Sequence, residues 1–421
     1  MHFLTKEQEK KINELLEQMT LEEKIGQMNL ETISIIGGID IPLEELAGMV
    51  YDGKMSFEEA HRLLRSAKKD YREDNIRKGR VGALMVADPE NANRLQKIAM
   101  EESRLGIPLL FGFDVIHGFR TVYPIALAEA GSFDEELFES TASMAARESR
   151  AHGINWHFAP MIDVGRDARW GRVAEGPGED PYLASVFARA KVRGLQGDRS
   201  STANYVAACL KHYVAYGACE GGLDYQTVTM ALSLLHNVYL PPYKTAVKEG
   251  AMSVMAAFND LNGIPCSVNS LILRKILKEA WGFKGFVVSD ANAVKECVNH
   301  GIAEDEEDAC VKAVNAGLDM DMSSETFISH LKEAVENGKV SMEVIDEAVM
   351  RILTVKMWLG LFEHPYVSLD AACQYDELPK EHVELALEAA LKSIVLLKNE
   401  NNLLPLKKET KISLVGELAD S

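Results

Sequence analysis

The sequence predicts an α/β protein built around a (β/α)8 barrel. Short apolar runs alternate along the chain with stretches whose apolar residues recur at helical spacing. Strands that alternate with helices pair in parallel, because each crossover needs a helix. Eight such runs occur, the number that closes this barrel, and 421 residues exceed the roughly 250 that it needs. The runs lie at residues 26–30, 81–86, 109–113, 154–158, 206–210, 253–257, 286–288 and 318–320.

Two helix-start signals open the chain. Thr5 with Gln8 and Thr20 with Glu23 have the spacing of capping boxes, and each pair precedes apolar residues at helical spacing. We therefore expect an N-terminal helix over residues 1–19, ahead of the barrel.

The barrel itself is expected to span residues 20–362. Its last helix is predicted over 341–361, because Gly360 and Pro365 are stop signals there. A lone strand cannot stabilise itself, so a strand pattern near the C-terminus predicts the start of a truncated α/β sandwich domain. The predicted parts are a linker at 363–410 with a helix over 382–397, and the domain start at 411–421 with a strand over 411–415.

Composition excludes several classes of protein. The net charge of −19 repels phosphate backbones and anionic lipid, so nucleic acid and membrane surfaces are not expected as partners. No apolar stretch approaches the ~20 residues of a membrane span, and the N-terminus as given has no apolar signal region, so we predict a cytoplasmic protein. The six cysteines are scattered without a CxxC pair, and neither a metal nor an organic cofactor is implied.

The candidate site consists of the polar residues that follow the apolar runs, since active sites of such barrels lie at the carboxyl ends of the strands. Without a phosphate-binding glycine loop, a rim rich in acids and cations suits a neutral polyol, whose hydroxyls bind ionised side chains. Glycoside cleavage needs an ionised carboxylate and a protonated carboxyl. The rim residues are Asp114, Asp163, Arg166, Asp167, Arg169, Arg172, Lys211, His212, Phe258, Asn259, Ser289, Asp290, Asp319 and Asp321.

Several long motifs resemble one enzyme family. The strings DVIHG, GRDARWGRVAEGPGEDPYL, KHYVAYG, SVMAAFNDLNG and GFVVSD occur in the order found in glycoside hydrolase family 3, in its bacterial β-glucosidase branch. The resemblance covers essentially the whole chain. It implies a retaining hydrolase that cleaves terminal nonreducing β-D-glucosyl residues through a covalent glycosyl-aspartate.

The resemblance also implies roles for individual residues. Asp290, in the VVSD motif, matches the family nucleophile, and neighbouring cations are expected to keep it ionised. Arg169 is expected to support the scaffold, and Asp319 and Asp321 to pack and cap strand ends. The residues expected to bind the sugar are Asp114, Arg172, Lys211, His212, Met255 and Phe258.

The proton donor is the missing part. In the β-glucosidase branch the acid/base Glu comes from the second domain, and KHYVAYG lacks the second His of the family's other route. Ala291 replaces a Trp that often stacks on the aglycone. If the acid lies within this chain, Glu220 is the first candidate. Two alternatives stay open: a sugar-binding barrel that is catalytically incomplete without a second domain or chain, and the same enzyme class acting on β-xylosides or α-arabinofuranosides.

Overall fold

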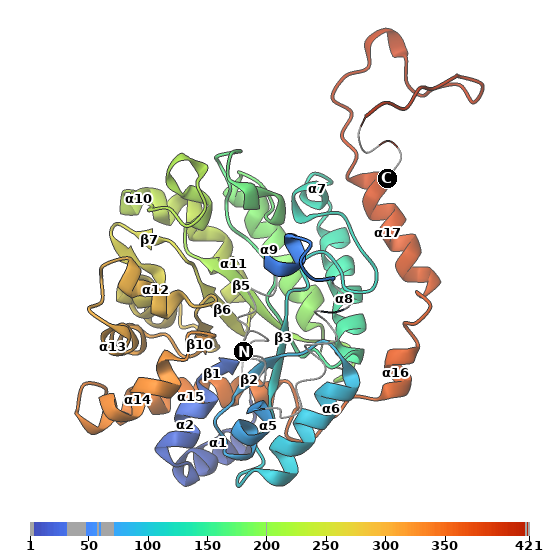
Figure 1. The fold of residues 1–421 in the computed structure, drawn as a ribbon. Helices are drawn as coiled ribbons and strands as arrows, with labels where there is room; N and C mark the ends of the chain where they lie inside the picture. Colours follow the sequence, from blue (N-terminus) through green and yellow to red (C-terminus); the bar gives the residue numbers. More distant parts are fainter. Residues whose placement is uncertain are drawn as a thin grey trace.

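The computed structural model describes residues 4–31, 48–56, 71–198 and 200–416, with the single residues 59 and 419. Within these ranges eight strands form one parallel sheet in the order β10-β1-β2-β3-β4-β5-β6-β9. A parallel bridge between Val288 and Met320 joins the two ends of this order, so the sheet closes. The predicted (β/α)8 barrel is confirmed, with its helices arranged around the strands (Figure 1).

Each strand lies in or beside one of the predicted apolar runs. β1 begins later than predicted, because Gly26 still belongs to helix α2. That helix packs so closely on the next loop that a Cβ at Gly26 would lie 1.9 Å from the carbonyl oxygen of Gly79. The strands are β1 (Asn29–Glu31), β2 (Ala83–Met85), β3 (Leu110–Phe113), β4 (Trp156–His157), β5 (Ala207–Tyr213), β6 (Ser253–Ala256), β9 (Phe286–Val288) and β10 (Asp321–Met322).

The last strand, β10, begins after its predicted run. Asp319 and Met320 both donate backbone hydrogen bonds to the carbonyl of Val287 in β9. Asp321 instead pairs with Asn29 of β1. Asp319 and Met320 therefore bond to β9, and the regular strand begins at Asp321, where the chain pairs with β1.

Helices cover the outside of the barrel (Figure 1). Both predicted capping boxes are present, at Thr5 and at Thr20. Within the described ranges, no helix is long and apolar enough to cross a membrane. The α-helices are α1 (Lys6–Gln18), α2 (Leu21–Gln27), α5 (Tyr71–Arg77), α6 (Pro89–Lys97), α7 (Ala126–Ala130), α8 (Glu135–Ala151), α9 (Pro181–Gln196), α10 (Leu232–Leu234), α11 (Pro241–Glu249), α12 (Ala293–Asn299), α13 (Glu306–Ala316), α14 (Thr326–Glu336), α15 (Met342–Trp358), α16 (Leu369–Cys373) and α17 (Lys380–Lys392).

Shorter elements complete the rim. A two-stranded hairpin of β7 (Asp260–Leu261) and β8 (Ile264–Pro265) follows β6. The 3-10 turn η2 (Gly171–Glu175) follows β4, and the π-helical segment η7 (Leu271–Ala280) precedes β9.

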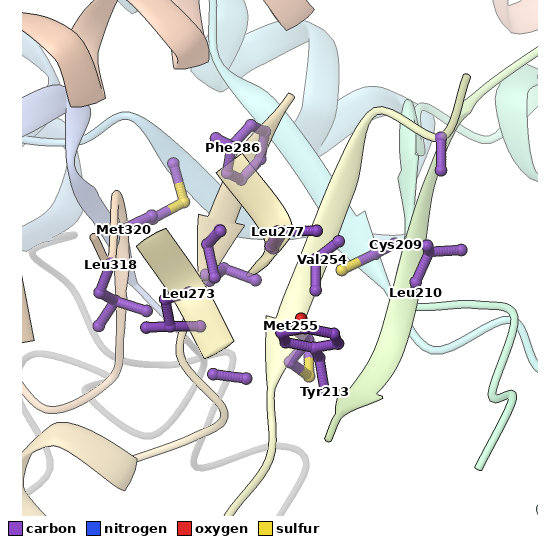
Figure 2. Close-up of a cluster of buried hydrophobic side chains, with 14 of the residues drawn as sticks. Cys209, Leu210, Tyr213, Val254, Met255, Leu273, Leu277, Phe286, Leu318 and Met320 are labelled. Atoms are coloured by element: carbon purple, nitrogen blue, oxygen red, sulfur yellow. The ribbon is translucent and has the colours of Figure 1, made fainter. Parts of the chain in front are cut away.

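The core between β5, β6, β9 and η7 positions the strands that carry the site. Its side chains are at most 2% exposed, so the strands are held by close packing and a deleted methylene would leave a cavity. Figure 2 shows Cys209, Leu210, Tyr213, Val254, Met255, Leu273, Leu277, Phe286, Leu318 and Met320 in this cluster.

The C-terminal segment is docked at first and then exposed. His382 of α17 is buried, with Nδ1 2.6 Å from Oε1 of Glu148 in α8. The helix predicted over 382–397 ends at Lys392, because the apolar residues beyond it have no surface to pack on, and Leu397 is 91% exposed. Beyond α17 the chain projects away from the barrel (Figure 1).

The strand predicted over 411–415 is not formed. Leu414 is 77% exposed, and the described residues place no strand beside it. A strand needs a neighbour for its backbone hydrogen bonds, so this sequence pattern alone does not produce one.

Candidate active site

The predicted site residues gather at the carboxyl ends of the strands. Asp114 follows β3, Lys211 and His212 lie in β5, and Asp290 follows β9. Direct contacts join them with Arg172: Lys211 binds Asp114, and His212 contacts both Arg172 and Asp290. The rim therefore brings together residues that are far apart in the sequence.

Asp290 presents a carboxylate oxygen without a hydrogen-bond partner. Its Oδ1 accepts the backbone N–H of Ala291 at 2.8 Å. Its Oδ2 is buried and has no partner among the described residues, and Nε2 of His212, at 3.6 Å, is too far for a hydrogen bond. An unpaired buried carboxylate oxygen is energetically unfavourable, and here it leaves one atom free to react.

The protonation of Asp290 is decided by its burial. Burial raises its pKa to about 7, although the positive charges of Lys211 and Arg172 and the N–H of Ala291 favour the ionised form. The charge of Asp114 acts in the same direction as burial. The attraction of the neighbouring cations and the loss of hydration thus oppose each other, and with a pKa of about 7 a large share of Asp290 is ionised at pH 7.

His212 is neutral, and Asp163 orients its ring. Nδ1 lies 2.9 Å from Oδ2 of Asp163, which also accepts the backbone N–H of His212 at 2.8 Å. Nη2 of Arg172 donates to Nε2 at 3.0 Å. Burial, reinforced by the charges of Arg172 and Lys211, lowers the pKa of His212 well below its usual value. A neutral imidazole that donates from Nδ1 accepts at Nε2, and the single lone pair of Nε2 accepts the N–H of Arg172.

Tyr243 of α11 forms hydrogen bonds to both His212 and Asp163. Its hydroxyl lies 2.7 Å from the carbonyl oxygen of His212 and 3.1 Å from Oδ1 of Asp163. All three residues are buried. Sequence reasoning placed Asp163 on the rim without a role and missed Tyr243, because no local pattern marks a helical residue that reaches a strand end.

Two adjacent residues of β5 face the site where the pairing of this strand is irregular. Neighbours in a regular strand point to opposite faces, but the register of β5 against β6 shifts between Leu210 and Tyr213. Nζ of Lys211 thereby reaches Oδ1 of Asp114 at 2.5 Å. The Lys211 side chain is 5% exposed and that of Asp114 51%, so the carboxylate keeps an open side.

The two arginines of the loop after β4 have different surroundings. Arg172 donates to both carboxylate oxygens of Glu175, at 2.7 and 3.0 Å, and its guanidinium carbon lies 5.5 Å from the centre of the Tyr216 ring. Arg169 is paired with Asp167 at the surface, with 71% of its side chain exposed. Arg172 is thus the one that touches the buried cluster.

Of the remaining candidates, Met255 and Phe258 lie in apolar surroundings and Glu220 lies at the surface. Met255 is buried in the cluster of Figure 2, and Phe258 is 8% exposed and stacks against Tyr225. Glu220, the alternative acid, is exposed in the loop after β5.

Asp319 and Asp321 have the packing and capping contacts predicted for them. Nζ of Lys278 lies 2.6 Å from Oδ1 of Asp319. Oδ2 of Asp321 accepts the backbone N–H of Thr326 at 3.0 Å, at the start of α14. These two acids hold the barrel wall together beside the site.

A cavity opens beside Asp114 and Glu175. Its volume is about 320 Å³, and its wall includes His117 and Ile125. This volume is near the lower end, about 300 Å³, of the range usual for small-molecule binding pockets. In the part of the chain that the structure describes, no three His, Cys, Asp or Glu side chains are grouped to hold a metal ion.

Comparison with known proteins identifies the family. The model described as "Glycosyl hydrolase family 3 N terminal domain" matches residues 20–355. The chain belongs to glycoside hydrolase family 3. This confirms the resemblance inferred from the motifs.

The similar proteins are β-glycosidases. The chain is 40% identical to the periplasmic beta-glucosidase of Salmonella typhimurium, covering 97% of this chain and 50% of that protein. It is also 40% identical to a beta-xylosidase of Formosa agariphila, covering 79% and 49%. The structure of a beta-glucosidase from Listeria innocua in complex with glucose matches with a TM-score of 0.83 at 40% identity, covering 96% and 54%. The chain therefore spans about half the length of these proteins.

The relatives correct the predicted location. The Salmonella protein is named as periplasmic, which contradicts the prediction of a cytoplasmic protein. That prediction was wrong because it rested on the N-terminus as given, and the residues of a barrel carry no record of the compartment.

Proposed function

We propose that this chain carries the nucleophile and the sugar pocket of a retaining β-glycosidase acting on terminal nonreducing β-D-glucosyl residues. The observation that carries the proposal is the unpaired Oδ2 of Asp290, buried beside His212. Membership of glycoside hydrolase family 3 and the β-glucosidases among its relatives support it.

The proposed chemistry uses Asp290 as the attacking group. Its ionised Oδ2 forms a bond to the anomeric carbon as the bond to the leaving oxygen breaks, which gives a covalent glycosyl-aspartate. Asp114 accepts sugar hydroxyls on its open side, and Lys211 donates beside it. Arg172, fixed against Nε2 of His212, offers N–H donors closer to the nucleophile. Met255 and Phe258 line the apolar side of the same sugar.

The proton donor is proposed to come from a second domain or chain. A retaining pair of carboxyl groups lies about 5–5.5 Å apart. Glu175 lies near the site, but both of its carboxylate oxygens accept hydrogen bonds from Arg172, which favours the ionised form, so we do not assign it as the proton donor. Support comes from the relatives, which are about twice as long, and from exposed apolar side chains such as Leu397 and Leu414. In this proposal residues 363–410 are a linker and 411–421 begin the second domain.

A second candidate keeps the mechanism and changes the sugar. The Formosa relative is named a beta-xylosidase at the same 40% identity, which favours β-xylosides as the alternative substrates. The motifs leave α-arabinofuranosides as a further alternative. Comparing the rates with matched aryl glucosides, xylosides and arabinofuranosides separates these choices.

The nucleophile can be tested by trapping. Incubation with 2-deoxy-2-fluoro-β-glucosyl fluoride should add one sugar to the peptide containing Asp290, as measured by mass spectrometry. Asp290→Asn should remain unlabelled, because an amide cannot attack or balance oxocarbenium charge. Glu220→Gln is the matched control and should label like the wild type. Labelling of another carboxylate, or persistent labelling of Asp290→Asn, would contradict the assignment.

A further inference from the structure

Tyr225 is a half-exposed aromatic residue that ring contacts link, through Tyr216, to His212 beside the proposed nucleophile. It is 48% exposed, and its ring stacks on Phe258 with centroids 4.4 Å apart. The ring of Tyr216 lies 6.3 Å from that of Tyr225 and 5.2 Å from that of His212. Burial and then the negative charge of Asp290 raise the pKa of Tyr225.

The loop around Tyr225 is anchored on both sides. Before it, Nε1 of Trp170 donates to Oδ1 of Asp224 at 2.8 Å. After it, Oγ1 of Thr227 donates to Oδ1 of Asp260 in β7, also at 2.8 Å. Tyr225 itself has φ +65°, a conformation that residues with a Cβ rarely adopt. The ring is therefore held by a fixed backbone, and little conformational freedom of the loop has to be lost when a ligand stacks on it.

The position of Tyr225 relative to the pocket indicates which part of a ligand it meets. Lys211 reaches from β5 to Asp114 after β3, whereas Tyr225 packs against Phe258, two residues after β6, the strand beside β9. Tyr225 therefore lies on the side of the rim that carries Asp290 rather than the side that carries Asp114. A glycoside with its hydroxyls at Asp114 and its anomeric carbon at Asp290 directs its leaving group away from Asp114.

We propose that Tyr225 is a specificity-determining residue that stacks against the leaving group. The inference rests on the proposed function of the same site. The ligand chemistry is a flat apolar ring face, supplied by an aryl aglycone or by the apolar face of a second pyranose. Ring stacking adds favourable energy beyond area burial, and Ala291, directly after the nucleophile, offers only a methyl group.

The test is calorimetric titration of the 421-residue chain with three probes that it does not hydrolyse. They are glucose, phenyl 1-thio-β-D-glucoside and S-linked thiocellobiose. Tyr225→Ala should weaken the phenyl thioglucoside or thiocellobiose by about 3- to 10-fold, the range expected for an aromatic pair, and leave glucose within twofold. The probe that loses more identifies the source of the ring face. Tyr225→Phe keeps the ring and should behave as wild type.

Controls separate this inference from the proposed function. Tyr182→Ala removes another exposed tyrosine, 77% exposed at the start of α9, and should change no affinity. If the wild type binds none of the probes, or Asp114→Ala binds glucose normally, the proposed function fails and takes this inference with it. If Asp114→Ala loses glucose but Tyr225→Ala weakens no probe, or weakens all three equally, the leaving-group role alone is overturned. Thermal unfolding of each variant confirms that it is folded.

Discussion

Asp290 and Asp319 are two buried acids at neighbouring places in the barrel wall with opposite surroundings. Asp319 is 1% exposed, and its oxygens accept from Nζ of Lys278 at 2.6 Å and from the N–H of Val287 at 2.8 Å. Asp290 is 8% exposed, accepts one backbone N–H and leaves Oδ2 unpaired among the described residues. Asp319 therefore has both oxygens occupied, as suits a stabilising contact, whereas Asp290 keeps one open at an energetic cost.

The largest expected effect concerns catalysis by the open oxygen. Azide should raise turnover of 2,4-dinitrophenyl β-glucoside, whose leaving group needs no proton, and yield β-glucosyl azide. The reason is that this chain, in our proposal, lacks the base that activates water, and general acid/base assistance is typically a factor of about 10² to 10⁴. Steady-state rates and product analysis check the prediction. Asp319→Asn, if folded, should respond to azide in the same way.

Fast hydrolysis of cellobiose without any azide effect would show that an acid/base lies within these residues. Glu220 would then be the first residue to replace. The contrast between the two acids would survive, but the proposed second domain would lose its catalytic role.

The second prediction concerns stability and its dependence on pH. The pKa of Asp290 is about 7 in the folded state, above the roughly 3.9 of an unfolded Asp. Between these values the folded state binds more protons, so the stability contributed by this group falls as pH rises. Asp290→Asn should therefore be more stable than wild type at pH 8, on the order of 2–4 kcal/mol, and similar at pH 4.

Asp319→Asn should behave in the opposite way. It removes the charge that lies 2.6 Å from buried Lys278 and leaves that ammonium only the contact to Glu347 at 3.8 Å, so unfolding should become easier by about 3 kcal/mol. Urea unfolding at pH 4 and pH 8 measures both variants. An Asp290→Asn protein no more stable than wild type at pH 8 would show that its open oxygen carries no energetic cost.

The smallest expected effect concerns the support of His212. Asp163→Asn replaces the acceptor that holds Nδ1–H, so the ring can take the other tautomer, whose Nε2–H would face the N–H of Arg172 and displace that side chain from the site. Glucose affinity should fall about tenfold, the scale of a hydrogen bond to a charged group. Asp167→Asn, which affects only the surface pair with Arg169, is the control and should bind normally. Calorimetric titration compares the two, and equal affinities would remove Asp163 from the site.

Local patterns were sufficient for most of the fold. The capping boxes at Thr5 and Thr20 depend only on residues three positions apart, and both formed. The strand over 411–415 has an equally clear pattern but did not form, because a strand depends on a partner outside its own sequence.

The sequence by itself determined the barrel, the family and the set of rim residues, because apolar spacing and long motifs are local properties of a chain. Only the tertiary structure decided which of those residues meet. It brought Tyr243 from α11 to Asp163. It buried Asp290, which raises the pKa of that carboxyl despite the cations around it. It also placed Lys211 and His212 on the same side of β5, where the register of the strand shifts. Distance, burial and register arise from packing between segments far apart in the sequence, and no local pattern records them.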